Sequence, residues 1–504
     1  MSATFSGVVV TKGGHILTAA HVDVPGKTYK VLFPDGKECV AEGLGKIELK
    51  QDKTIPDAAM MKILTKGSWP HASISRRQLT KGELCFGVSY PESLGQTFPT
   101  VRLGSISNVK TERGFIQSTC IMEPGDSGGP LFDTDGFVIG LHSAIEIAES
   151  ANYDVPVATY LKYWDALQQP KIYQEYPDVT TSKALGGQRS KGGSRSESHP
   201  KLLTTPLKTG SPVCGFVSSR SASSRDTAVA TMINTDHLGT EDRGVNQLWI
   251  GKSSLIPYDP VISYQKQILV ANIIARDKES DLVLLSTRKV THTTGIKLSA
   301  STDEQNLQGK FLISQLPNGK VIMSICGSNL FPLQKHYNIG YLGAAIAYHK
   351  EPLLITKVSP GSPADTAGLK TGDEIITING KTLSQASDFG DILQKCWPGD
   401  TVNFVVKRGT ASLRRSVILG VLPVKPSGHP AEVFKGGKSQ RRDGFTSVFT
   451  HDAVIVQNNC GSPVFDLNGN FCGINIARFS RGCTLVLPPS VIRRFIQQSL
   501  QKRI

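Results

Sequence analysis

Short apolar runs separated by turn-forming residues occupy the first third of the chain. The clearest are SGVVVT, HILTAAHV, KTYKVLF, DAAMMKIL and GFVIGLHSA. Runs this short, rich in β-branched residues and bounded by glycine, proline and aspartate, are typical of strands in a barrel or a sandwich. The run YLKYWDALQQ (160–169) instead resembles a short terminal helix. We therefore predict a fold that is dominated by β-structure.

Breaker-rich sequence divides the chain into segments. Residues 170–210 are rich in proline, glycine, serine and lysine and have no sustained hydrophobic period, which is typical of a flexible linker. Strand-like runs resume after it and are interrupted by a stretch of different character at 337–424. We predict a first domain over 1–169, a basic linker over 170–210, and a second domain over 211–336 and 425–504 that carries an inserted module at 337–424.

The two halves of the chain share motifs in the same order. PLFDTDGFVIGLHSA (130–144) and PVFDLNGNFCGINIA (463–477) have one strand–turn–strand pattern. GHILTAAHV aligns with TMINTDHL and PDAAMMKI with SDLVLLST, which places His21 opposite His237 and Asp57 opposite Asp281. Three matches in one order are better explained by a duplicated domain than by chance.

The composition narrows the classes of partner. At 504 residues the chain is too long for one domain, and no apolar run is as long as a membrane span. The nine cysteines form no CxxC pair, so we expect neither a disulfide framework nor a metal cluster, and no other cofactor. The net charge of +14 comes from lysines and arginines that are spread along the chain without aromatic interleaving. This pattern does not predict a specific nucleic-acid partner.

The segment EPGDSGGPLFD (123–133) surrounds Ser127 with residues that have almost no side chain. Glycine is unfavourable in a packed strand but suits a tight turn or a place where N–H groups face a ligand. A serine becomes a nucleophile when an imidazole accepts its proton and a carboxylate orients the imidazole. TAAH supplies His21 at the end of one apolar run, and PDAAMMK supplies Asp57 at the start of another. The N–H groups of Gly125 and Ser127 would bind the oxyanion of the intermediate.

TAAH, D-x-A with a following lysine, and GDSGGP stand in the order His, Asp, Ser, and TFSGVVVTKGGHILTAAHV precedes them. In these motifs the first domain resembles the trypsin-like serine proteases, in particular the HtrA/Deg branch. The resemblance implies two six-stranded β-barrels with the active site between them. It assigns His21 as general base, Asp57 as its orienting carboxylate and Ser127 as nucleophile. It also places Ile121 at the base of the specificity pocket, which argues against a preference for Lys or Arg.

The inserted stretch reads YLGAA, then SPADTAGLKTGDEIITING, then QASDFGDILQK and VNFVVKR. This order resembles a PDZ domain of the HtrA type. Such domains bind an extended peptide by strand addition, and loop N–H groups hold its C-terminal carboxylate. The resemblance assigns that loop to Tyr341, Leu342, Gly343 and Ala344 and implies polypeptide substrates and C-terminal peptides as partners. In HtrA proteases the PDZ module follows the protease domain, whereas here protease-like sequence resumes after it with FTHDAVIVQNNCGSPVFD.

The second half has a cysteine, Cys460, where the first has its serine. A thiolate beside an imidazole is a competent nucleophile, so His237, Asp281 and Cys460 form a candidate second site. Asn458 and Ser462, however, replace two glycines of the family pattern, and Asn458 lies where an oxyanion N–H has to face outward. We favour the other interpretation, a domain without hydrolytic activity in which Cys460 is a small buried residue. The fold class that follows is two trypsin-like double β-barrel domains plus one PDZ domain.

Two functions remain open. The first is a serine endopeptidase of HtrA/Deg type that hydrolyses peptide bonds of unfolded or exposed protein segments and binds peptides through its PDZ domain. The second is a PDZ peptide-binding scaffold or chaperone with inactive protease folds. The family resemblance implies a periplasmic or otherwise extracytoplasmic location and a homo-oligomer, but MSATFSG lacks the basic region and apolar core of a signal peptide. Because Met1 stands shortly before Gly7, we expect that the barrel lacks its first strand or that the natural start lies upstream.

Overall fold

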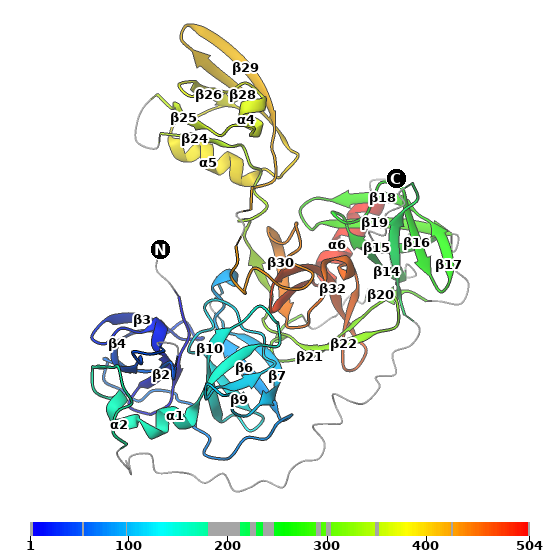
Figure 1. Ribbon diagram of the computed structural model, residues 1–504. Coiled ribbons are helices and arrows are strands. Elements are labelled where there is room, and N and C mark those ends of the chain that lie inside the picture. Colours follow the sequence, from blue (N-terminus) through cyan, green and yellow to red (C-terminus); the bar gives the residue numbers. More distant parts are fainter. Residues whose placement is uncertain are drawn as a thin grey trace. The chain divides into compact units, whose positions relative to one another are not determined.

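The computed structural model describes residues 4–52, 55–96, 98–179, 212–221, 228–234, 246–288, 294–298, 304–347, 352–424 and 427–501. The chain divides into two compact units (Figure 1). The first spans Met1–Phe331, Gly428–Ser439 and Ser447–Ile504, and the second spans Pro332–Ser427 and Gln440–Thr446. The second unit contains the whole stretch 337–424, and the first contains residues 1–169 and most of 211–336 and 425–504.

The first sheet of the large unit has six strands in the order β1-β2-β5-β4-β12, with β3 paired to β4. The strands are β1 (Val8–Val9), β2 (His15–Ala19), β3 (Thr28–Leu32), β4 (Glu38–Ile47), β5 (Ala58–Ile63) and β12 (Ile172–Tyr173). β12 lies in the segment 170–210 that we expected as a linker, and it pairs in parallel with β4. This sheet therefore extends to Tyr173, and residues 180–211 lie outside the described part of the chain.

Six further strands form a closed barrel in the order β10-β11-β8-β7-β6-β9. They are β6 (Leu84–Ser89), β7 (Thr100–Asn108), β8 (Ile116–Ser118), β9 (Pro130–Asp133), β10 (Val138–Ile145) and β11 (Asn152–Pro156). Two short helices follow, α1 (Val157–Lys162) and α2 (Trp164–Leu167), which confirms the helix expected near 160–169. Tyr160, Trp164 and Leu167 pack into one buried cluster with Leu17 and Leu141, because their spacing puts them on one face of the helical segment.

The remaining strands of the large unit form two more sheets. The eight-stranded sheet has β13 (Cys214–Ser219), β14 (Ala228–Asn234), β15 (Asn246–Lys252), β16 (Pro260–Tyr264), β17 (Gln267–Val270), β18 (Asn272–Asp277), β19 (Leu282–Arg288) and β20 (Ile296–Lys297). The seven-stranded sheet has β21 (Phe311–Gln315), β22 (Val321–Ile325), β23 (Phe331–Leu333), β30 (Phe445–His451), β31 (Pro463–Asp466), β32 (Phe471–Ser480) and β33 (Cys483–Leu487). Helix α6 (Pro489–Gln501) ends the described chain.

The sheets differ from the two barrels per domain that the family resemblance implied. Among the described residues one sheet closes, and the other three large sheets are open, so the fold has one β-barrel and half-barrels. In the first sheet the edge strand β1 is two residues long and pairs only with β2, which leaves too few backbone groups there to join the opposite edge.

The described residues of the small unit form two sheets and two helices. β24 (Ala344–Ile346) pairs with β25 (Ile355–Val358), and the second sheet has the order β27-β26-β28-β29. Its strands are β26 (Glu374–Ile378), β27 (Lys381–Thr382), β28 (Thr401–Arg408) and β29 (Ala411–Ile418), and its helices are α4 (Pro363–Thr366) and α5 (Ala386–Lys395). In the sequence this unit lies between β23 and β30, which are neighbours in one sheet. Insertions are tolerated between such strands because their ends lie close together.

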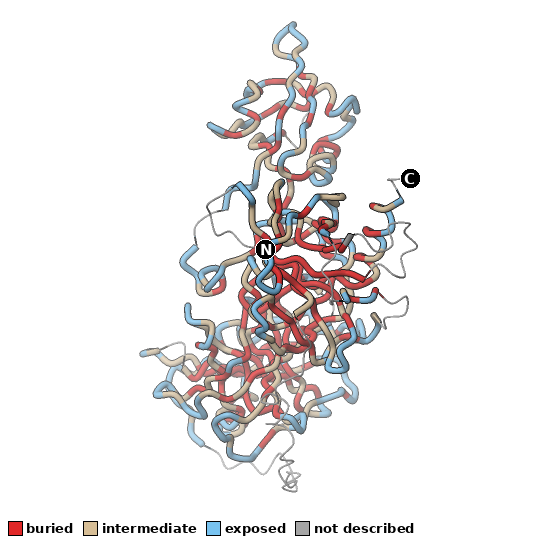
Figure 2. Tube along the Cα trace, turned by 90° about the vertical axis from the view of Figure 1, so that its right-hand side faces the viewer, coloured by how far each residue is buried: buried red, intermediate tan, exposed pale blue. Residues whose placement is uncertain are grey.

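Burial follows the strands in both units. Figure 2 shows buried residues along the sheets and exposed residues at the turns. In β4, buried and more exposed positions alternate along the first half of the strand, as expected when only one face of a strand lies in a core. Within the described residues, no helix combines the length and the apolar character needed to cross a membrane.

Candidate active site

Three elements bring the residues of the expected triad together. His21 lies in the 3₁₀ turn η1 (Ala20–Val22) directly after β2, Asp57 directly precedes β5, and Ser127 lies just before β9. β2 and β5 are paired with Ala19 opposite Ala58, so His21 and Asp57 meet at the same end of two neighbouring strands.

The three side chains form one hydrogen-bonded chain. Nδ1 of His21 lies 2.9 Å from Oδ2 and 3.1 Å from Oδ1 of Asp57, and Nε2 lies 3.0 Å from Oγ of Ser127. An ionised carboxylate only accepts hydrogen bonds, so Nδ1 carries the proton and Nε2 is left to accept the hydroxyl of Ser127. The Asp57 side chain is 3% exposed and that of His21 46%, which gives a buried orienting group and an accessible base.

The backbone at Asp57 is in the left-handed region, with φ +53°. Aspartate tolerates this conformation better than most residues. The turn lets Oδ1 of Asp57 accept the N–H of His21 at 2.9 Å, so the carboxylate holds both the ring and the main chain of the histidine. Asp281, which we aligned with Asp57 in the sequence, has φ +56° and is also in the left-handed region.

Ser143 is a residue whose role sequence reasoning missed. From the sequence we assigned Ser143 no part in the triad. In the structure the Ser143 hydroxyl donates a short hydrogen bond to Oδ2 of Asp57. No sequence signal indicated this contact, because Ser143 in β10 and Asp57 before β5 are far apart in the chain.

The net environment raises the pKa of His21. Burial lowers this pKa, but the hydrogen bond and the negative charge of Asp57 raise it by more, while the positive charge of Lys46 lowers it slightly. A raised pKa makes the imidazole a stronger proton acceptor, as a general base for a hydroxyl requires.

The loop before Ser127 presents two backbone donors. Gly125 has φ +96°, and a Cβ at this position would lie 2.5 Å from the backbone nitrogen of Glu92, so only glycine fits. The hydroxyl of Ser6 donates to the carbonyl of Gly125 at 2.8 Å, which fixes the orientation of that peptide. Among the described residues, no protein atom accepts a hydrogen bond from the N–H of Gly125 or of Ser127. These are the two donors that the sequence predicted for an oxyanion.

A buried ion pair stands next to the nucleophile. Nη1 of Arg102 lies 2.6 Å from Oδ2 of Asp126, and the two side chains are each 1% exposed. Oδ1 of Asp126 accepts the hydroxyl of Ser89 at 2.8 Å, and Oδ2 accepts the N–H of Glu123 at 2.7 Å. The pair therefore links β6 and β7 of the barrel to the residue directly before Ser127.

The candidate second site is arranged differently. His237 lies outside the described residues. Asp281 accepts hydrogen bonds from Nζ of Lys252 at 2.6 Å and from the backbone N–H of Ser254 at 2.8 Å. Cys460 is fully buried, and burial raises the pKa of its thiol, which disfavours the nucleophilic thiolate.

The backbone around Cys460 also departs from that around Ser127. Asn458 lies in the 3₁₀ turn η3 (Gln457–Asn459), and the N–H of Cys460 donates to the carbonyl of Gln457 at 3.0 Å. The counterpart of one oxyanion donor is thus already bound within the chain. Ser462, which replaces a glycine, accepts a hydrogen bond at its hydroxyl from the Asn475 amide at 2.9 Å.

The predicted peptide-binding loop of the small unit precedes β24. The N–H of Tyr341 donates to Gly420 at 2.8 Å, so this amide is already engaged. Leu342 is buried, Gly343 has φ +80°, and Ala344 starts β24. Within the described part of the chain no protein atom accepts the N–H groups of Leu342 and Gly343, and β24 pairs along one edge only. The loop thus has two amides and a strand edge that a peptide could use.

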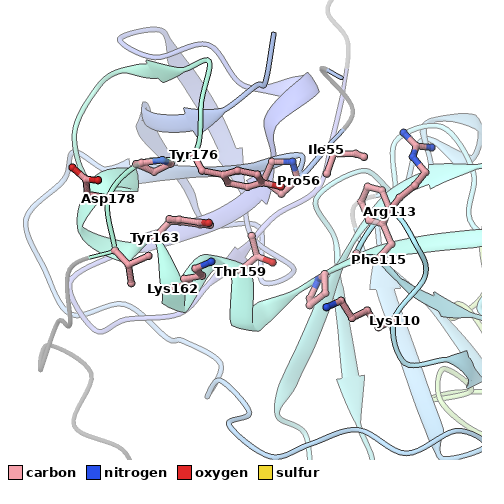
Figure 3. A pocket seen from close by; sticks show the side chains of 14 residues that line it. Ile55, Pro56, Lys110, Arg113, Phe115, Thr159, Lys162, Tyr163, Tyr176 and Asp178 are labelled. Carbon is pink, nitrogen blue, oxygen red and sulfur yellow. The ribbon is translucent and has the colours of Figure 1, made fainter. Parts of the chain in front are cut away.

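The structure also has a cavity of about 560 Å³ (Figure 3). Phe115, Tyr163 and Tyr176 line it together with Lys110 and Lys162, which gives it an aromatic and basic character. None of the residues that we predicted as catalytic lines this cavity, although Pro56 precedes Asp57 in the sequence. This cavity is therefore lined by other residues than His21, Asp57 and Ser127.

Comparison with known proteins bears on two parts of the chain. Residues 5–141 match the family model for a trypsin-like peptidase domain, and residues 340–419 match that for a PDZ domain. Neither match covers residues 211–336 and 425–504, so the second trypsin-like domain stays a prediction.

The curated relatives are serine proteases. A protein named probable periplasmic serine endoprotease DegP-like from Bartonella henselae is 24% identical over 77% of this chain and 69% of its own length. A protein of the same name from Hahella chejuensis is 22% identical over 81% of this chain and 78% of its own. Serine protease HTRA1 from Xenopus laevis is 30% identical over 31% of this chain, and the match spans 34% of that relative.

The similarity to solved structures is low by TM-score. The serine endoprotease from Yersinia pestis is 17% identical, and the alignment covers 83% of this chain and 89% of that one with a TM-score of 0.28. Fold and motifs together define a chain with a trypsin-like peptidase domain and a PDZ domain. The chain is a distant homologue of the HtrA/DegP-type serine endoproteases.

Proposed function

We propose that this protein is a serine endopeptidase of HtrA/Deg type that hydrolyses peptide bonds in unfolded or exposed protein segments. The observation that carries the proposal is the unbroken hydrogen-bonded chain from Asp57 through His21 to Ser127. It stands beside two backbone N–H groups that no described protein atom occupies.

In this mechanism the Ser127 hydroxyl attacks the carbonyl carbon of the scissile peptide while Nε2 of His21 takes its proton. Asp57 holds the imidazole in the required tautomer and stabilises the imidazolium that forms. The N–H groups of Gly125 and Ser127 bind the oxyanion. In related enzymes the removal of one such donor lowers kcat about 10²–10³-fold. The proton on Nε2 then passes to the leaving amine, and a water molecule releases the acyl group by the same steps.

The PDZ domain would supply substrate or regulatory peptides. We infer that an extended C-terminal peptide adds to the free edge of β24, with its carboxylate at the N–H groups of Leu342 and Gly343. Tyr341 and Ala344 would flank this site. Ile121 in the specificity pocket favours apolar over basic side chains at the cleaved bond, because it brings no acidic group to pair with Lys or Arg.

We infer no hydrolytic role for the second half. Burial of Cys460, the engagement of Asp281 by Lys252 and the occupied N–H of Cys460 all support an inactive domain. The scaffold function that we considered from the sequence would then apply to this half of the chain and not to the first.

A fluorophosphonate probe tests the proposal, since it reacts only with a serine that is activated in this way. We expect full-length protein to be labelled once, at Ser127, and Ser127→Ala to be unlabelled although folded by circular dichroism. An unstructured polypeptide substrate should be cleaved by the natural sequence alone. Absence of labelling in folded full-length protein would favour the peptide-binding scaffold with inactive protease folds.

A further inference from the structure

The hairpin formed by β32 and β33 contacts the loop that carries the nucleophile. We name residues 121–127 the Ser127 loop and residues 478–483 the hairpin tip. Glu123 of the Ser127 loop is 5% exposed, and its Oε1 accepts the N–H of Gly482 at 2.6 Å and the hydroxyl of Ser480 at 2.5 Å. One carboxylate oxygen of the first half is therefore bound by two donors of the second.

The same hairpin tip holds the neighbouring loop between β10 and β11. Nη2 of Arg478 lies 3.0 Å from Oε1 of Glu149, and Nη2 of Arg481 donates to the carbonyl of Ala148 at 2.6 Å. Arg478 is 1% exposed and Arg481 fully buried. Burying two guanidinium groups is unfavourable unless they are paired and hydrogen-bonded, so this contact is a specific arrangement.

Glu123 is also fixed within its own loop. Its N–H donates to Oδ2 of Asp126 at 2.7 Å, and its carbonyl accepts the N–H of Asp126 at 3.1 Å. The carbonyl of Pro124 accepts the N–H of Glu92 at 2.9 Å. Glu123 and the peptide that carries the N–H of Gly125 therefore belong to one hydrogen-bonded loop.

We propose that the hairpin tip acts as a built-in clamp that keeps the Gly125 and Ser127 amides in the geometry needed to bind an oxyanion. Glu123 is the positioning residue that receives the clamp. The second half then supports catalysis in the first half without having an active site of its own. This explains why it has a cysteine in place of the nucleophilic serine and a backbone N–H that is already bound. The inference rests on the proposed peptidase function, because it assigns a role to residues around the same nucleophile.

Two substitutions separate the carboxylate's acceptor role from its charge. Glu123→Ala removes the acceptor for Gly482 and Ser480, and we expect the rate of fluorophosphonate labelling to fall at least tenfold. The upper limit is about 10²–10³, the loss for one missing oxyanion donor. Glu123→Gln keeps an oxygen that accepts both hydrogen bonds, and we expect labelling within threefold of the natural rate. With a peptide substrate the loss should appear in kcat while KM stays near its original value, since the oxyanion contact forms in the transition state.

A substitution in the second half tests the clamp from its other side. A Cβ at Gly482 would lie 2.9 Å from the carbonyl oxygen of Ile121 and 3.0 Å from Oε1 of Glu123, so Gly482→Val pushes the hairpin tip away. Gly428→Val is the matched control, because a Cβ there meets no atom within 4 Å. We expect Gly482→Val to slow labelling at least tenfold and to speed hydrogen exchange in residues 120–128, whereas Gly428→Val changes neither.

The outcomes are distinguishable from failure of the proposed function. If the natural sequence is not labelled, the peptidase proposal fails, and exchange in residues 120–128 of Gly482→Val still decides the clamp. The clamp is overturned if residues 120–128 of Gly482→Val exchange at the natural rate. It is also overturned if Gly482→Val is labelled at the natural rate although its residues 481–485 exchange faster. If Gly482→Val does not fold, the Glu123→Ala and Glu123→Gln pair decides: equal labelling of both variants refutes it.

Discussion

Arg102 and Asp126 form an ion pair that is excluded from water and lies directly before the nucleophile. Nη1 of Arg102 is 2.6 Å from Oδ2 of Asp126, and each side chain is 1% exposed. Arg102→Met keeps an unbranched side chain of similar length but removes the charge. The Asp126 carboxylate would then stay buried with two donors, the hydroxyl of Ser89 and the N–H of Glu123.

The size of the effect follows from these contacts. Removing one partner of a buried pair costs about 3–5 kcal/mol, because the other charge is left uncompensated. We expect the lower end, about 3 kcal/mol, since Asp126 keeps two hydrogen bonds. For a domain of this size the loss corresponds to a fall of about 6–12 °C in the midpoint of thermal unfolding. Asp126→Asn alone should destabilise comparably, because it leaves the guanidinium of Arg102 buried beside a neutral amide.

The double variant Arg102→Met with Asp126→Asn gives the decisive comparison. With both charges removed, most of the stability should return, and the coupling energy of the cycle should be about 2–3 kcal/mol. Hydrogen exchange of β6 and β7 at increasing urea concentration reports unfolding of the barrel that holds the pair separately from the rest of the chain. A loss below 1 kcal/mol for Arg102→Met, or a double variant as unstable as the sum of the single ones, would refute the reasoning.

Three further predictions concern the two halves of the chain. The rate of fluorophosphonate labelling should fall as the pH drops through a midpoint above 6.5, because protonated His21 cannot act as a base and Asp57 raises the pKa of His21. In Asp57→Asn this midpoint should move to lower pH. A maleimide should not modify Cys460 in the folded protein, because its thiol is fully buried, and rapid modification would contradict this burial. Cys460→Ala should leave fluorophosphonate labelling of Ser127 unchanged. Gly128→Ala should abolish labelling and lower the free energy of unfolding by several kcal/mol, because its Cβ would lie 2.4 Å from the Ser6 carbonyl oxygen. Gly136→Ala is the control: Gly136 has a similar φ and open space around it, so we expect a loss of about 1 kcal/mol in thermal unfolding and unchanged activity.

The covalent order of the motifs was sufficient to predict a good part of the first half. Short apolar runs and turn residues indicated strands, and the final helical segment was expected close to where α1 and α2 lie. TAAH, PDAAMMK and GDSGGP identified the three side chains that meet, because each motif places its functional residue at the end of a strand. Local sequence indicates such positions because turn-forming residues and glycines bound the short apolar runs.

Only the tertiary structure decided the contacts between distant segments. The hydrogen bond from Ser143 to Asp57, the pairing of Arg102 with Asp126 and the contact of Gly482 with Glu123 join residues far apart in the chain. No periodicity or motif encodes them, because each depends on how whole sheets pack. The same holds for the burial of Cys460: a cysteine at this place in the sequence is compatible with a nucleophile, and only the packing around it shows that the thiol is fully buried.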